Sequence, residues 1–430
     1  MKRIGLISVI ICLLAVAALG LSACKINPDT PIQEFSVDKD YIRVGIISDS
    51  QLPNTREENE YQNNLIRALS AFKARGVDMI MFGGDITDLS KSKAYDLYTA
   101  AYDRVFGNDR PIVQTIMGNH DYWGHGVASS CRRIFTKKVG HGPWTHYVVN
   151  GYHFIGASPD SGSMDNGYKK VADWLRGEIE KAVADDADKP VFVMTHNGAR
   201  GTAYGTEEWG DYSLDDIFKD YPQVVNFSGH SHYSLLDERS IHQRDYTSIA
   251  TQSVSYTELE TGKVNGTIPP NASATPMGYV MDVHTDKVEI IRVNFSTAFG
   301  EEGLVEKQPW VLPIPLTRDG FVYTYARASV NSAPEMSSSE GVCRVDGGSA
   351  YLEFDAGMDD DFVHSYKLVW SDGLEQLYFS DFYNGLTTMS RKVSLAISRK
   401  AGTYGVKIYA VDSWGAVSAG YTEIKDVTIS

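Results

Sequence analysis

Short apolar runs that alternate with helical stretches constrain the fold of this chain more than any other feature. Residues 57–75, about 92–105 and about 168–183 have the spacing of amphipathic helices, and between them lie apolar segments of strand length. Strand-helix-strand alternation predicts a layered α/β domain. Five of the apolar segments are predicted as buried strands: 43–48 (RVGIIS), 77–82 (VDMIMF), 112–117, 191–195 (VFVMT) and 224–228 (VVNFS).

The rest of the chain is richer in predicted strands. Further strands are expected within 246–256, 278–283 and 287–294. Three prolines in KQPWVLPIPLTRD (307–319) disfavour helix and central strand and mark a domain boundary. The region 321–430 then shows about seven or eight short alternating runs separated by Gly, Asp and Ser, which predicts a β-sandwich. Its last segment resembles the final strands of a fibronectin type III or immunoglobulin-like module.

The amino terminus is organised like an export signal. Lys2 and Arg3 precede an apolar run over 4–21, and Leu-Ser-Ala-Cys follows, ending at Cys24. This resembles a bacterial lipoprotein signal, which implies cleavage before Cys24, lipidation of its thiol and anchoring of the exported protein to the cell envelope. An uncleaved transmembrane helix is the alternative. The predicted division is signal 1–23, spacer 24–40, first domain 41–308, linker 309–319 and β-sandwich domain 320–430.

The net charge restricts the classes of ligand that the protein can bind, and the cysteine content restricts the possible disulfides. The formal net charge of -15 argues against binding of nucleic-acid polymers through their phosphates. A phosphate-bearing substrate would therefore need a local positive centre, which bound metal ions supply. Outside the signal and Cys24, only Cys131 and Cys343 remain, in different predicted domains, so a disulfide and two separate thiols are both open.

Each of the five predicted buried strands is followed directly by residues that bind metals. Loops after neighbouring strands gather at one edge of a sheet, so these residues are expected to meet there. The five segments are Asp49-Ser50-Gln51, Asp85-Ile86-Thr87-Asp88, Asn119-His120-Asp121, His196-Asn197 and His230-Ser231-His232.

In their order and in the patterns GDxxD, GNHD and GHxH, these segments resemble the calcineurin-like metallophosphoesterase family over about residues 41–295. The resemblance implies a four-layer α/β/β/α sandwich and a dinuclear site with two divalent metal ions, Mn, Fe or Zn. It makes Asp85 the bridging carboxylate, with Asp49, Gln51 and His232 at the first metal. Asn119, His196 and His230 would bind the second, and His120 would act on the substrate as the catalytic residue.

The chemistry explains these residue types. Phosphoester hydrolysis needs a nucleophilic oxygen at neutral pH, neutralised phosphoryl oxygens and a stabilised leaving oxygen, and two metals can supply all three. The resemblance implies a hydroxide between the metals as the attacking group, with His120 steadying the phosphoryl charge or protonating the leaving group. Asp88 and Asp121 are expected to hold the ring of His120 or of a ligand histidine, and which acid serves which ring stays open.

Gln51 and the loop 198–212 are the two features whose role in the site is open. The family usually has His at the position of Gln51, and an amide oxygen binds borderline transition metals less tightly, so Gln51 is expected to weaken or retune the first metal site. In the loop 198–212, Arg200, Tyr204 and Trp209 either line the substrate pocket or pack as an ordinary surface loop.

The sequence therefore predicts a tethered, exported phosphoester hydrolase. Its substrate would be a small molecule or a lipid headgroup, and phosphodiesters are favoured over monoesters because an exported enzyme meets nucleotides, glycerophosphodiesters and lipid headgroups. The alternative is a catalytically weak or inactive surface lipoprotein that binds a glycan or another envelope ligand. The oligomeric state stays open.

Overall fold

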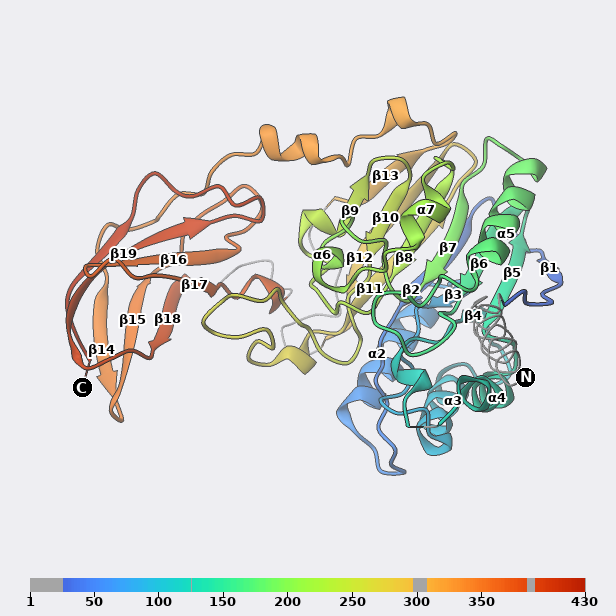
Figure 1. Cartoon of the computed structure of the whole chain (residues 1–430), viewed down its shortest axis with the longest axis horizontal. Helices are drawn as coiled ribbons and strands as arrows, with labels where there is room; N and C mark the ends of the chain where they lie inside the picture. The colour runs from blue at the N-terminus through green and yellow to red at the C-terminus, as the bar shows by residue number, and fades with distance from the viewer. Residues whose placement is uncertain (1–25, 125, 297–307, 385–390, 430) are drawn as a thin grey trace, which may run out of the picture.

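The computed structural model describes residues 26–429 except 125, 297–307 and 385–390. It consists of an α/β domain followed by an all-β domain (Figure 1). The predicted signal and Cys24 lie outside the described residues. Within the described ranges, no helix has the length and apolar character needed to cross a membrane.

Two sheets form the centre of the first domain. The six-stranded sheet has the order β13-β12-β11-β2-β3-β4, and the seven-stranded sheet the order β1-β5-β6-β7-β8-β10-β9. Strands of the first sheet are β2 (Ile42–Ile47), β3 (Met79–Phe82), β4 (Ile112–Thr115), β11 (Met277–Val283), β12 (Lys287–Asn294) and β13 (Trp310–Pro313). Those of the second are β1 (Ile32–Phe35), β5 (Trp144–Val149), β6 (Tyr152–Ala157), β7 (Val191–Thr195), β8 (Val224–Ser228), β9 (Ile241–Gln243) and β10 (Thr247–Ala250).

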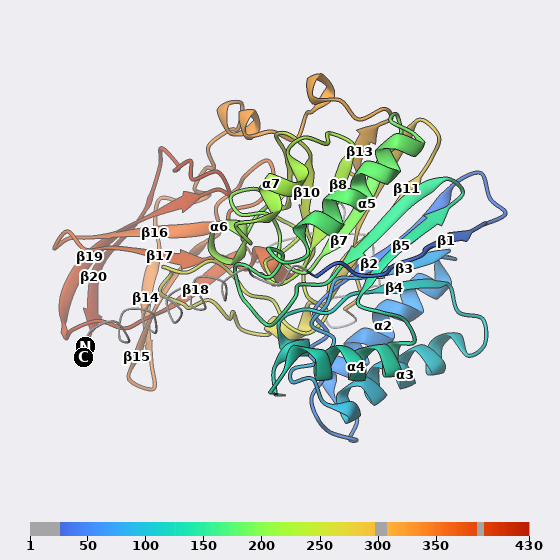
Figure 2. The same ribbon diagram turned by 45° about the vertical axis from the view of Figure 1, so that its right-hand side comes forward.

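Helices cover the outer face of each sheet, which gives the predicted four layers (Figure 2). Against the six-stranded sheet pack α2 (Glu60–Ala74), α3 (Ser92–Phe106) and α4 (Ala128–Val139), and against the seven-stranded sheet pack α5 (Ala172–Asp185) and α7 (Leu214–Phe218). A third apolar core lies between the sheets, where side chains such as Val44 and Met81 meet Phe154 and Phe192. Burial on both faces explains why central strands such as β3 and β7 are almost entirely apolar.

Several elements differ from the sequence-based expectation. β1 pairs in parallel with β5, although its residues fall in the predicted spacer. β13 pairs with β12, so residues 310–313 of the predicted linker form the edge of the first domain's sheet. The helix α4 was not predicted, because its residues are mostly polar and only Cys131 and Phe135 among them are buried.

The C-terminal domain is the predicted sandwich of antiparallel sheets. A three-stranded sheet, β14-β15-β18, faces a four-stranded sheet, β17-β16-β19-β20, across a single apolar core. Cys343 lies in β14 and Cys131 in α4, and both thiols are free. The strands are β14 (Val342–Asp346), β15 (Ser349–Asp355), β16 (Ser365–Trp370), β17 (Glu375–Phe379), β18 (Lys392–Ile397), β19 (Gly402–Val411) and β20 (Thr422–Ile429).

One buried carboxylate ties together the loops that follow β3 and β4. The Asp121 carboxylate accepts backbone N–H bonds from Ile86 (3.1 Å), Thr87 (3.1 Å) and Gly118 (3.0 Å). It also accepts the hydroxyls of Thr87 (2.9 Å) and Tyr95 (3.1 Å). The expectation that Asp121 holds a histidine ring is therefore replaced by a structural role, because five donors already occupy its two oxygens.

We expect Asp121→Asn to lower the free energy of unfolding by about 2 kcal/mol, because an amide has one accepting oxygen and would turn its own N–H₂ towards buried donors. Burial and the nearby Asp85 raise the pKa of Asp121 to about 6, so urea unfolding is best measured at pH 8, where the carboxylate is ionised. Asp88→Asn, at an exposed side chain, is the matched control. Equal stability of Asp121→Asn and wild type would contradict this role.

Candidate metal centre

The five predicted ligand segments converge at one edge of the two sheets. β2, β3 and β4 run parallel to one another in one sheet, as β7 and β8 do in the other. Each predicted metal ligand follows the end of its strand by no more than four residues. Because the carboxyl ends of these strands face the same edge, their loops bring the side chains together, as the sequence predicts.

The backbone is strained at these positions. Among the described residues, eight non-glycine residues have positive φ, and five of them are predicted ligands. Positive φ costs free energy at non-glycine residues and persists only where the surrounding structure enforces it, most often at functional sites. The five are Asp49, Gln51, Asp85, His230 and His232, with φ between 46° and 71°.

Oxygen atoms of three other residues surround the ring of His196. Its Nδ1 lies 2.8 Å from the Gly83 carbonyl oxygen, which accepts the Nδ1 proton and turns Nε2 towards the centre. That Nε2 lies 2.9 Å from Oδ1 of Asn119 and 3.4 Å from Oδ2 of Asp85. Burial would lower the pKa of His196, but Asp85 raises it to about 9. Asp85 thus favours a proton on the His196 ring, at the point where nitrogen and oxygen donors meet.

His230 completes this group. A ligand atom of Asp85, one of His196 and one of His230 lie within 4.8 Å of one another. The Nε2 atom of His230 is buried and has no hydrogen-bond partner, and burial together with His196 lowers its pKa to about 3. A neutral, unpartnered imidazole nitrogen beside a carboxylate and an amide oxygen fits a divalent metal ion, since buried polar atoms are otherwise almost always bonded.

A second group lies around Asp49. Its Oδ1 is 3.2 Å from Nε2 of His232, and its Oδ2 accepts the backbone N–H of His230 at 3.1 Å. The Tyr256 carbonyl oxygen, 3.0 Å from Nδ1 of His232, directs the other ring nitrogen to Asp49. Burial would raise the pKa of Asp49, but His232 holds it below its usual range.

Gln51 contacts Asp85 of the first group. Its Nε2 donates to Oδ2 of Asp85 at 3.0 Å, and its backbone N–H donates to the Asp85 carbonyl at 2.9 Å. The side chain is 3% exposed, so it lies inside the centre rather than at its rim. Its carboxamide therefore touches the carboxylate predicted to bridge the metals.

Two glycines allow the loops to approach this closely. A Cβ at Gly118 would lie 2.2 Å from Oδ1 of Asp85, and one at Gly229 would lie 2.3 Å from Oδ2 of Asp49. Real Cβ atoms do not come this near to other atoms, so any side chain would displace a predicted ligand. The glycines of the GNHD and GHxH patterns are thus required by packing.

His120 occupies the open side of the centre. Its side chain is 21% exposed, its Nδ1 is 2.9 Å from the Asp88 carbonyl oxygen, and its Nε2 is 3.9 Å from Oδ2 of Asp85. The Asp88 carboxylate lies 3.5 Å from the same Nδ1, as expected for a residue that orients the ring. Trp123 packs on the imidazole with 4.0 Å between ring centroids.

The three predicted pocket residues of the loop 198–212 take different positions. Trp209 lies edge-on to the ring of His230, with centroids 5.8 Å apart, and so borders the centre. Arg200 stacks on Tyr212 at 4.5 Å. Tyr204 is buried against Glu260 and His364 instead, so it contacts the C-terminal domain and does not line the centre.

Tyr256 and Tyr168 support the centre but were not predicted. The hydroxyl oxygen of Tyr168 accepts the His196 backbone N–H at 2.6 Å, and Tyr256 supplies the carbonyl that orients His232. Both residues lie in segments predicted only as a helix or a strand. A carbonyl oxygen leaves no mark in the residue type, so no pattern could have identified the role of Tyr256.

Comparisons with known proteins agree with this arrangement. The family described as calcineurin-like phosphoesterase matches residues 42–234. No curated protein sequence matches the chain. Similar solved structures include a dimetal phosphatase from Danio rerio (12% identity, TM-score 0.43, covering 65% of this chain and 100% of that one). The purple acid phosphatase PPD1 of yellow lupin (13% identity, TM-score 0.46) covers 65% of this chain and 55% of its own.

A further similar structure is GAP50, the anchor in the inner membrane complex of Plasmodium (15% identity, TM-score 0.43, covering 65% of this chain and 90% of that one). The family match and the donor group of Asp85, His196 and His230 point to divalent metal ions. Residues 42–234, within the first domain, thus match the calcineurin-like phosphoesterase family.

Proposed function

We propose that the protein is a metal-dependent phosphoester hydrolase that uses two divalent ions. The unpartnered Nε2 of His230, beside Asp85, His196 and Asn119, is the observation that carries the proposal. These four residues would hold one ion. Asp49 and His232, with Asp85 and Gln51, would hold the other, and Mn, Fe and Zn all fit such mixed nitrogen and oxygen donors.

Bound metal ions would supply an activated water and neutralise charge on the phosphoryl oxygens. The residues of the chain would position the substrate and supply a proton to the leaving oxygen. Because the Asp88 carbonyl accepts the Nδ1 proton of His120, Nε2 is the free ring atom, and it would donate a proton to a leaving oxygen from the imidazolium form, in which both ring nitrogens carry a proton. Trp123 restricts the rotation of this ring by packing on it.

We further propose a phosphodiester as the preferred substrate, with monoesters as the alternative. An exported enzyme meets nucleotides, glycerophosphodiesters and lipid headgroups, and this expectation supports diesters. Steady-state rates with bis-p-nitrophenyl phosphate and p-nitrophenyl phosphate at equal concentration compare the two classes. A higher kcat/KM for the monoester would overturn the preference.

Loss of hydrolysis on removal of His120 or Asp85 is the central test. We expect His120→Ala to lower kcat about 10²- to 10⁴-fold while metal binding persists, because only the proton-donating group is removed. Asp85→Asn should abolish turnover and metal binding together. Mn²⁺-loaded protein is assayed on both nitrophenyl esters, and metal content is measured by elemental analysis.

Arg344→Ala serves as the matched control, since Arg344 forms an exposed ion pair with Glu353 in the C-terminal domain. If wild type shows no metal-dependent turnover above His120→Ala and Asp85→Asn, the protein is instead an inactive surface protein that binds an envelope ligand.

The contact between Gln51 and Asp85 leads to a second expectation. Gln51→His should tighten binding of the weaker metal about tenfold, because an imidazole nitrogen is a better ligand than an amide oxygen for borderline transition metals. Titration of apo protein with Mn²⁺ and Zn²⁺, followed by calorimetry, measures stoichiometry and affinity. Identical stoichiometry, affinity and metal preference in both proteins would contradict a ligand position for Gln51.

We propose export and lipid anchoring through Cys24. Cells that express the full chain should incorporate a labelled fatty acid into the wild type and not into Cys24→Ser. The wild type should also fractionate with membranes. Equal labelling of the two proteins would exclude this anchor.

A further inference from the structure

The C-terminal domain is joined to the metal-centre loops by buried polar contacts. The first set surrounds Glu260, whose side chain is 16% exposed. Nε2 of His364, in the C-terminal domain, lies 3.0 Å from Oε1 of Glu260, and the Tyr204 hydroxyl donates to Oε2. Arg239 lies 3.5 Å from the same carboxylate and stacks on the Tyr204 ring at 4.3 Å. Glu260 therefore contacts residues of both domains and connects them.

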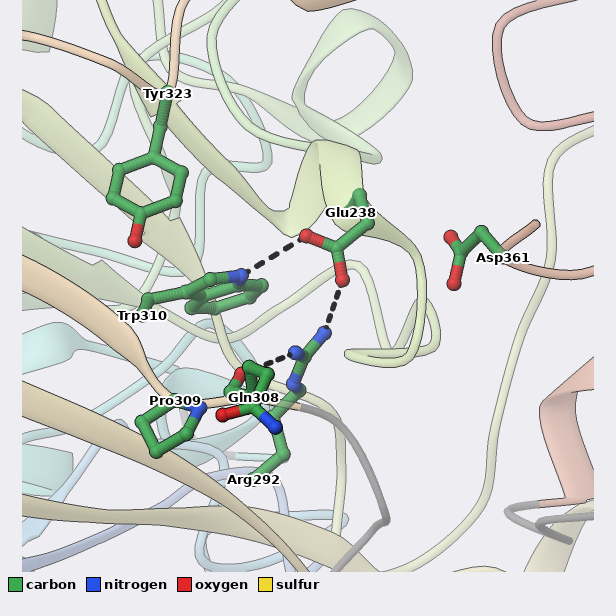
Figure 3. Close-up of a pocket in the computed structure, with 7 residues that line it drawn as sticks. All are labelled: Glu238, Arg292, Gln308, Pro309, Trp310, Tyr323 and Asp361. Atoms are coloured by element: carbon green, nitrogen blue, oxygen red, sulfur yellow. Dashed lines mark hydrogen bonds and ion pairs between the residues drawn. The ribbon is translucent and has the colours of Figure 1, made fainter. Parts of the chain in front are cut away.

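A second set surrounds Glu238, the neighbour of Arg239 in the chain (Figure 3). Glu238 accepts from Arg292 (2.6 Å) and from Trp310 Nε1 (3.1 Å) at the wall of a cavity of about 280 Å³, with Asp361 of the C-terminal domain on its opposite side. Arg327, which lies between β13 and β14, donates to the Glu238 carbonyl at 3.0 Å. Its guanidinium lies 5.3 Å from the ring of Trp414, in the C-terminal domain.

A third set joins the Asn265 side chain and the Val264 backbone to the main chain of the C-terminal domain. Asn265 exchanges two hydrogen bonds with the main chain of Phe379, at 2.9 and 3.2 Å, and the Val264 N–H donates to Leu377 at 2.8 Å. Leu259 is buried in an apolar cluster with aromatic side chains of the C-terminal domain, Phe379 among them. The segment 258–265 is therefore attached to the edge strand β17.

These contacts lead directly to the predicted metal ligands. Glu258 donates its N–H to the His232 carbonyl at 3.0 Å, and the ring of Tyr204 lies 4.9 Å from that of Tyr233. A Cβ at Gly205, next to Tyr204, would lie 2.7 Å from Cβ of Ser231, the residue between the two ligand histidines. The turn held by the C-terminal domain thus packs on the loop that carries both ligands.

We propose that the C-terminal domain positions the loop of His230 and His232, and Trp209 beside it, through the contact of His364 with Glu260. His364, Glu260 and Tyr204 are positioning residues of the metal centre. A domain that only tethers the enzyme has no need of a buried carboxylate shared by both domains, since burial of such a group is costly unless its partners are fixed. This role deepens the proposed hydrolytic function and rests on it for its kinetic readout only.

The test compares His364→Ala, His364→Gln and the control Arg344→Ala in the full chain. We expect His364→Ala to weaken Mn²⁺ binding and to lower kcat about tenfold, because small displacements of ligands are costly, with a smaller change in KM. Hydrogen exchange should accelerate in peptides that cover 198–212 and 229–235. His364→Gln, which can still donate to Glu260, should recover most of the loss, and Arg344→Ala should match wild type.

Unchanged hydrogen exchange and Mn²⁺ affinity in His364→Ala would overturn the proposal. If His364→Ala does not fold, Asn265→Ala removes an independent part of the same attachment and should accelerate exchange in the same two peptides. No effect there would also overturn it. Exchange and metal binding are measured without substrate, so an absence of hydrolysis in wild type would refute the proposed function and leave the positioning role to be decided by these two measurements.

Discussion

The candidate metal centre depends on the close approach of two backbones at the ends of β3 and β4. A Cβ at Gly84 would lie 2.6 Å from the backbone nitrogen of Gly118, and one at Gly118 would touch Asp85. Asp121 then accepts N–H groups from both loops and keeps them together. This contact places the Asp85 carboxylate at the junction of the two sheets, and the other ligand loops assemble around it.

The candidate metal centre buries two carboxylates and three histidines in one small volume, so the negative charge of the carboxylates must be compensated there. Asp49 and Asp85 are almost completely buried, and burial alone would favour their neutral forms. Asp85 raises the pKa of His196, which favours a proton on this ring and compensates part of that charge. A metal ion bound at Nε2 of His196 would take the place of that proton, which would link metal affinity to pH.

Sequence patterns predicted the sheets and the ligand loops well because both depend on local residue types. The apolar runs that became β7, β8 and β12 have the predicted bounds, and the ligand segments after β2, β3 and β4 lie at one edge. The supporting contacts depend on the tertiary fold instead. Tyr204 was expected either to line the substrate pocket or to pack within a surface loop, but the neighbouring domain buries it.

The proline-rich segment at the end of the first domain also protects the edge of the six-stranded sheet. Pro313 ends β13, the last strand of the six-stranded sheet, and Pro315 follows two residues later. Proline lacks the N–H that another strand would need for pairing. The segment that carries the chain towards its second domain thereby also discourages the outer strand from recruiting a strand of another molecule, a common route to aggregation of open sheets.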